Sequence, residues 1–184
     1  MPRAGSAHDP VDAPRAGCGG AWSAAPTIGA MTSSPDAAPG ATSAPVKALT
    51  PAEGDLILAD RFAPWVQALG LSVLETGSRH AVLRLPWSDQ LARDGGGLSG
   101  QAMMAAADTA TVVAVSSALG GFAPMTTVQQ SITFQRAARG TDLLVTARLT
   151  KLGRRIAFAE IILATPDAPD DPVAHATTVY AFPG

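Results

Sequence analysis

The chain has 184 residues, 47% of them hydrophobic, which suits one domain with a buried core and makes a second domain unexpected. A formal net charge of −2 gives no general attraction to nucleic acid or to an anionic membrane surface, so we expect neither as a partner. Cys18 is the only cysteine, which excludes an intramolecular disulfide and favours a reducing compartment, the cytoplasm.

Residues 1–48 are dominated by Ala, Pro, Gly and Ser, a composition typical of disordered chain. They contain no continuous apolar run of the kind that a secretory signal needs, and Met31 could equally be the first residue of the protein. We therefore predict a dispensable tail over residues 1–48 and a folded domain over residues 49–184.

The signals of a helix start follow this tail. Thr50 is a capping residue, a proline occupies the first helical position, and Glu53 is placed to complete a capping box. The pattern predicts a helix over residues 51–69 that Pro64 kinks or divides and that Gly70 ends.

A hairpin and a long helix are predicted next. Residues 71–75 and 79–85 are short runs of Val and Leu joined by turn residues, which is typical of a β-hairpin, and a glycine-rich loop over residues 86–97 comes after them. Ser99 can cap the long helix through its hydroxyl, and Gly120 ends it.

The remainder of the chain has the pattern of antiparallel strands. Residues 127–135 alternate in polarity with a period of two, as a strand does. Further strands are predicted at 142–152, 156–165 and 173–182, with turns at 151–154 and 166–172. Several strands and one helix that is apolar all round predict an α+β fold in which an antiparallel sheet wraps that helix.

Asp108 is the one ionisable residue between Ala102 and Leu119, inside the predicted long helix. An ionised carboxylate in apolar surroundings must find partners or change its protonation, and such groups concentrate at functional sites. The alternative is a structural carboxylate, hydrogen-bonded to Thr109 or Thr111, that fixes the register of a helix contact. The same charge argues against a membrane-spanning helix.

Four segments of the chain carry a resemblance to a known family. They are LSGQAMMAAADTA (98–110), TTVQQSITF (126–134), RAARG (136–140) and LGRRIAF (152–158). Together they resemble the acyl-CoA thioesterases of the hotdog superfamily, in particular the phenylacetate-degradation type, over residues 55–183. The resemblance implies the hotdog fold, an antiparallel β-sheet wrapped around a long central α-helix.

The central-helix motif of that family matches in part. The family typically opens this helix with His-Gly-Gly and places an acidic residue nine positions after the histidine. The same offset leads here from Ser99 to Asp108, so Gly100 matches the first motif glycine. Ser99 replaces the histidine, Gln101 replaces the second glycine, and Arg93 stands about where many relatives have a substrate-facing asparagine. We expect these three residues at the substrate.

The resemblance also implies a reaction, the hydrolysis of an acyl-CoA thioester without metal or cofactor. The acyl group would be small or medium, and it could be aromatic. Asp108 would act as nucleophile or general base, the backbone N–H of Gly100 would polarise the carbonyl, and Thr127 would position water. The altered motif keeps open the alternative of a non-catalytic hotdog protein that binds an acyl-CoA or only dimerises.

The spacing of Gly100 and Asp108 predicts a site made from two chains. Eight residues of helix correspond to about 12 Å along the axis. Two groups so far apart cannot both contact one thioester at distances of about 3 Å. The N–H donor must therefore come from the antiparallel helix of a second copy. We expect a homodimer, and such dimers could pair into a dimer of dimers.

Basic residues gather late in the chain. Six of the 13 lie within twenty positions: Arg136, Arg139, Arg148, Lys151, Arg154 and Arg155. Such groups, in particular Arg154 and Arg155, could hold the phosphates of coenzyme A. The alternative is that they protect sheet edges and keep the surface soluble. The histidines have no partner at metal-ligand spacing, so no metal site is expected.

Overall fold

The computed structural model describes residues 46–183 of the chain. Apart from its last three residues, the predicted tail over residues 1–48 lies outside this range, and so do Met31 and Cys18. The predictions made for that segment therefore remain predictions.

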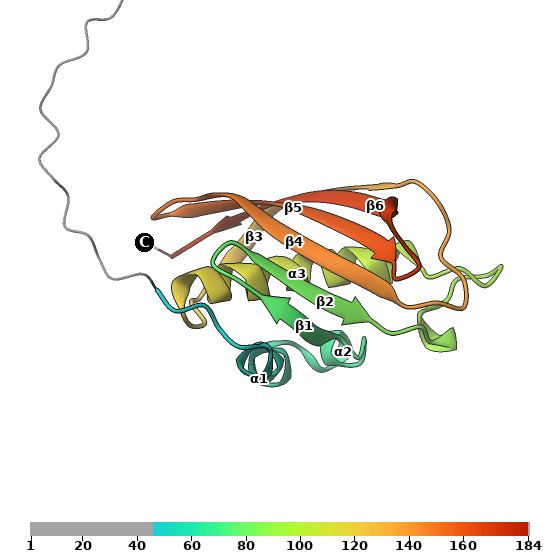
Figure 1. Ribbon diagram of the computed structural model, residues 1–184, viewed down its shortest axis with the longest axis horizontal. Helices are drawn as coiled ribbons and strands as arrows, with labels where there is room; N and C mark the ends of the chain where they lie inside the picture. The colour runs from blue at the N-terminus through green and yellow to red at the C-terminus, as the bar shows by residue number, and fades with distance from the viewer. Residues whose placement is uncertain (1–45, 184) are drawn as a thin grey trace, which may run out of the picture. The chain divides into compact units, whose positions relative to one another are not determined.

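Six antiparallel strands form one sheet in the order β1-β2-β4-β5-β6-β3. The strands are β1 (Ser72–Thr76), β2 (His80–Leu85), β3 (Thr126–Phe134), β4 (Leu143–Leu152), β5 (Ile156–Thr165) and β6 (Ala168–Ala181). The helices are α1 (Pro51–Arg61), α2 (Pro64–Gln67) and α3 (Gly100–Leu119), with a short 3-10 turn at Asp89–Leu91. Figure 1 shows α3 running along one face of the sheet, with α1 and α2 beside β1. The predicted α+β hotdog fold is confirmed.

The central helix α3 is buried along most of its length. Thirteen of its residues are buried, many of them alanines whose small side chains let the sheet approach closely. The Ser99 hydroxyl accepts from the N–H of Ala102 at 3.3 Å, and Gly120 ends the helix at a φ of 71°. Among the described residues α3 alone is long and apolar enough to cross a membrane, but 72% of its apolar window is buried inside the fold.

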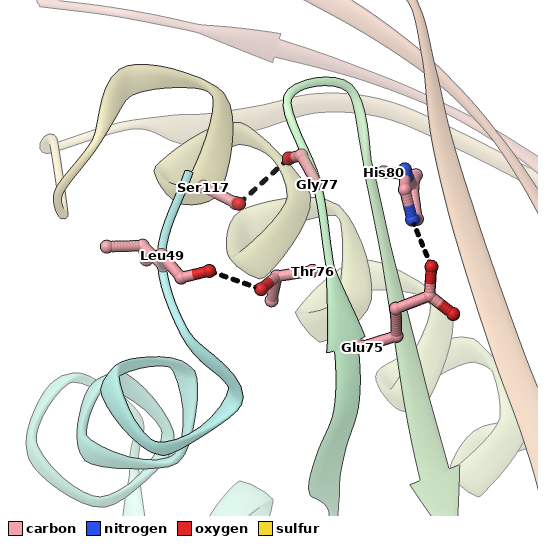
Figure 2. Close-up of polar contacts among 6 residues, drawn as sticks. All are labelled: Leu49, Glu75, Thr76, Gly77, His80 and Ser117. Atoms are coloured by element: carbon pink, nitrogen blue, oxygen red, sulfur yellow. Dashed lines mark hydrogen bonds and ion pairs between the residues drawn. The ribbon is translucent and has the colours of Figure 1, made fainter. Parts of the chain in front are cut away.

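Two hydrogen bonds tie the β1–β2 hairpin to its neighbours, one to the start of the folded chain and one to α3 (Figure 2). The Thr76 hydroxyl donates to the carbonyl of Leu49 at 2.5 Å, which holds the segment before α1 against β1. The Ser117 hydroxyl donates to the carbonyl of Gly77 at 2.8 Å, which joins the last turns of α3 to the hairpin. The hairpin is thus held to the segment before α1 by the first bond and to the last turns of α3 by the second.

The helix predicted over residues 51–69 is divided at Pro64 into α1 and α2, as expected, although α2 already ends at Gln67. The seven-residue turn predicted over 166–172 is wrong, because β6 already begins at Ala168. The proline at 172 is tolerated because it pairs with Ala164 where the register between β5 and β6 shifts, and irregular positions accept a residue without an N–H.

Within the described residues 46–183, the strand β3 forms one edge of the sheet and pairs only with β6. Its register shifts between Thr127 and Gln129, so Val128 bulges out of the ladder. Val128 is 61% exposed and Phe134 is 46% exposed, although both are large apolar side chains. The predicted strand is present, but a single chain leaves its apolar side chains partly uncovered.

Candidate active site

Two hydroxyl groups of the sheet converge on the carboxylate of Asp108. The Tyr180 hydroxyl donates to Oδ1 at 2.5 Å, and the Thr127 hydroxyl donates to the same oxygen at 3.0 Å. Asp108 is half-buried on α3, so these donors supply the partners that an acid in an apolar helix needs. The structure thus brings together Asp108 and Thr127, two residues that the sequence analysis assigned to the candidate site.

The structural alternative for Asp108 receives no support from Thr111. The hydroxyl of Thr111 donates to the carbonyl of Ala107 at 3.1 Å and lies 3.0 Å from the hydroxyl of Thr178. Thr111 is therefore engaged with the backbone and with β6 and not with Asp108. The carboxylate contacts the edge strand and β6 in place of its neighbours along the helix.

Tyr180 was not singled out from the sequence. It lies on β6 directly opposite Thr127 of β3, so both side chains stand on the same face of the sheet. It is only 2% exposed, and its hydroxyl also lies 3.0 Å from the carbonyl oxygen of Asp108. Burial raises the pKa of the Tyr180 phenol, and the negative charge of Asp108 and its hydrogen bond raise it further, while Thr127 lowers it. Tyr180 therefore remains a hydrogen-bond donor at neutral pH.

The first turn of α3 carries unpaired backbone donors. Ser99 caps the N–H of Ala102, whereas the N–H groups of Gly100 and Gln101 have no acceptor within residues 46–183. A Cβ atom at position 100 would lie 3.0 Å from Cζ of Phe134, so glycine permits the close approach of that ring. Unpaired N–H groups at a helix N-terminus can stabilise a developing negative charge.

A hollow of about 270 Å³ lies beside this first turn. It is lined by Gly100, Met103, Phe134 and Arg93, together with Arg136 and its neighbours. The structure thus brings the predicted residues Arg93 and Gly100 together. Asp108 does not line this hollow, because it lies about 12 Å further along the helix axis at about 1.5 Å per residue. Within one chain the acid and the donors are separate.

Arg154 and Arg155 lie elsewhere. Both are exposed in the turn between β4 and β5. Arg154 lines an apolar hollow of about 470 Å³ together with Leu119, the last residue of α3. The two arginines are therefore at the opposite end of α3 from Gly100, and a single chain does not unite them with Arg93.

Two predicted contacts near the helix start can also be placed. The side chain of Gln101 is exposed, and the side chain of Ser99 serves as the helix cap. Over residues 46–183, no group of three or more His, Cys, Asp or Glu side chains is arranged to hold a metal ion.

Comparison with known proteins places these features in a family context. The sequence profile of the thioesterase superfamily matches residues 95–168. A candidate thioesterase from Silicibacter sp. is 31% identical, with a TM-score of 0.67, and the match covers 76% of this chain and 96% of that one. Zebrafish thioesterase superfamily member 2 is 26% identical, with a TM-score of 0.65, covering 73% of this chain and 99% of that one.

A further similar structure is the PaaI protein of the Escherichia coli phenylacetic acid degradation operon. It is 19% identical, with a TM-score of 0.63, and the match covers 72% of this chain and 92% of that one. At this identity the likeness concerns the fold alone. No curated protein matches the sequence.

Asp108→Asn should change the free energy of unfolding by less than about 1 kcal/mol, because the amide has the same size and its oxygen can still accept from both hydroxyls. Urea denaturation of wild-type and variant protein measures this difference. A loss above about 3 kcal/mol would instead assign Asp108 a structural role.

Proposed function

The chain belongs to the thioesterase superfamily, and on that premise we propose that it hydrolyses the thioester of a small or medium acyl-CoA, aromatic acyl groups included. The observation that carries the proposal is the carboxylate of Asp108, which two sheet hydroxyls engage on a single oxygen. A half-buried acid that is held in this way is suited to act on a reacting group.

Asp108 would supply the reactive group. As a nucleophile its carboxylate attacks the thioester carbonyl, the coenzyme A thiolate leaves as the C–S bond breaks, and water then hydrolyses the mixed anhydride. As a general base the carboxylate removes a proton from a water that attacks the carbonyl, and the thiolate leaves and takes up a proton. The Thr127 hydroxyl donates a hydrogen bond to Asp108, and its oxygen can still accept a hydrogen bond from that water. Both routes use chemistry that these side chains supply without a metal or a cofactor.

The N–H of Gly100 from a second copy of the chain would bind the carbonyl oxygen. Within one chain, Gly100 and Asp108 are too far apart to contact the same thioester. Antiparallel α3 helices in a homodimer would bring Asp108 of one copy to Gly100 of the other. The exposed apolar side chains of Val128, Phe134 and Met104 offer a surface that a second copy can cover. Such dimers could pair further, and we expect the protein to act in the cytoplasm.

Three arginines are suited to the phosphates of coenzyme A. Within residues 46–183, Arg93, Arg154 and Arg155 form no ion pair, so their guanidinium groups can meet an anionic substrate. Arg136, which shares the hollow beside Gly100, is already paired with Asp171 at 2.9 Å. This supports Arg93 over Arg136 as the contact in that hollow.

The competing function is a catalytically silent protein that binds an acyl-CoA or only dimerises. The observation that favours it is Ser99, which occupies the motif histidine position and serves as the helix cap. A thiol-release assay over aliphatic and aromatic acyl-CoAs separates the two. Binding of these compounds without turnover by the wild-type protein would support the silent protein.

Asp108→Asn should lower kcat by about 10²-fold or more, because the amide can neither attack the carbonyl nor take a proton. The thiol-release assay measures the rate, and size-exclusion chromatography checks that the oligomer is unchanged. Turnover close to wild type in an intact oligomer would remove Asp108 from the mechanism.

Gly100→Pro should lower kcat by about 10²- to 10³-fold, because it deletes the N–H that stabilises the oxyanion. Proline suits this position, the first of the helix, and Ser99 before it already has an extended backbone with ψ of 146°. Gly100→Ala is the matched control, since it places the same Cβ against Phe134 and keeps the N–H. Equal losses in the two variants would show that the N–H takes no part.

A further inference from the structure

We infer that Tyr180 is a positioning residue that, together with Thr127, engages Oδ1 of Asp108 and leaves Oδ2 as the oxygen that reacts. The inference rests on the proposed thioesterase activity and specifies which oxygen of the Asp108 carboxylate reacts. It assigns a role to a buried side chain that the reaction scheme above does not use.

First, the two carboxylate oxygens of Asp108 differ in their hydrogen bonds. Both donors, the hydroxyls of Tyr180 and Thr127, meet Oδ1. Within residues 46–183, Oδ2 accepts no hydrogen bond. An oxygen that already accepts two hydrogen bonds has fewer lone pairs for a substrate or a water. The reacting electron pair is therefore supplied by Oδ2.

The second step is the rigidity of the Tyr180 anchor. Tyr180 is 2% exposed and pairs with Thr127 on one side and with Ala157 of β5 on the other, so its strand is held from both directions. Its hydroxyl lies within hydrogen-bond distance of both the carboxylate and the carbonyl oxygen of Asp108. The anchor thus fixes the side chain of Asp108 relative to its own backbone. Precise placement of this kind is what a reacting group requires.

The third step is the direction of the hydrogen bond. Because burial and the charge of Asp108 raise the pKa of Tyr180, the phenol stays protonated at neutral pH and can only donate to the carboxylate. The Thr127 hydroxyl is exposed and can exchange partners with water, whereas the Tyr180 hydroxyl is not. Of the two hydroxyls that donate to Asp108, that of Tyr180 is therefore the one that does not exchange with water.

Tyr180→Phe tests this role, because it removes only the hydroxyl. We expect kcat to fall by about 10- to 100-fold while KM changes by less than about twofold, since the reacting oxygen is displaced and the substrate contacts remain. The matched control is Thr178→Val, which removes another buried hydroxyl that joins β6 to α3 but contacts Thr111 and not Asp108. The control should keep the wild-type kcat.

A second readout does not depend on turnover. Tyr180 is the only tyrosine, so a ¹³Cζ tyrosine label gives one resonance. This resonance should shift in Asp108→Asn at neutral pH, because the acceptor loses its charge, and should stay in place in Thr178→Val. If Tyr180→Phe does not fold, this comparison of the tyrosine resonance still tests the hydrogen bond between Tyr180 and Asp108.

The inference is overturned if Tyr180→Phe keeps the kcat of the Thr178→Val control, if KM rises as much as kcat falls, or if the resonance is the same in Asp108→Asn. Failure of the proposed function gives a different result, because the wild-type protein would then release no thiol from any acyl-CoA. An active wild type with an unaffected Tyr180→Phe variant would remove the inference alone.

Discussion

The placement of a carboxylate on an otherwise apolar helix is the constraint on which the rest of this molecule depends. A negative charge on α3 would destabilise the fold unless hydrogen-bond donors contacted it. The sheet supplies two such donors, the hydroxyls of Thr127 and Tyr180 on adjacent strands. Because β3 and β6 pair with Thr127 opposite Tyr180, both hydroxyls reach the same oxygen of Asp108. The edge strand β3 and its neighbour β6 therefore line the proposed site.

The length of α3 imposes the second constraint. Among residues 46–183 the first N–H groups of α3 have no acceptor, and these groups and the carboxylate of Asp108 in the middle of the helix are too far apart to contact one thioester within a single chain. Arg93 lies beside the first turn of α3, whereas Arg154 and Arg155 lie near the other end of the helix, beyond Asp108. The exposed apolar side chains of β3 have a simple explanation if a second copy covers them and completes the site.

Much of this arrangement could be predicted from local sequence. The capping residue Ser99, the closing Gly120 and the isolated charge of Asp108 act within one helix, so their signals are local. Most strands could be predicted because alternating polarity, short runs of Val and Leu, and turn residues are also local signals. The start of β6 was missed because prolines normally argue against a strand, and the register irregularity that accepts Pro172 is not visible in the sequence.

Tyr180 was missed for a different reason. Its partner Asp108 is 72 positions away, and the two meet only because β6 packs against α3, a contact that one sequence does not reveal. The same limit applies to Phe134, whose ring packs against Gly100 from the far end of β3. Non-local pairing thus decides which side chains complete the site, whereas local patterns identify only the acid and the helix start.

Complementation between two inactive variants tests the central claim, a site shared by two chains, most directly. A heterodimer of Asp108→Asn and Gly100→Pro chains, purified through two different affinity tags, retains one site with both an intact acid and an intact N–H donor. We predict about half of the wild-type activity per dimer, although each homodimer is inactive. A heterodimer as inactive as the two homodimers would contradict the shared site.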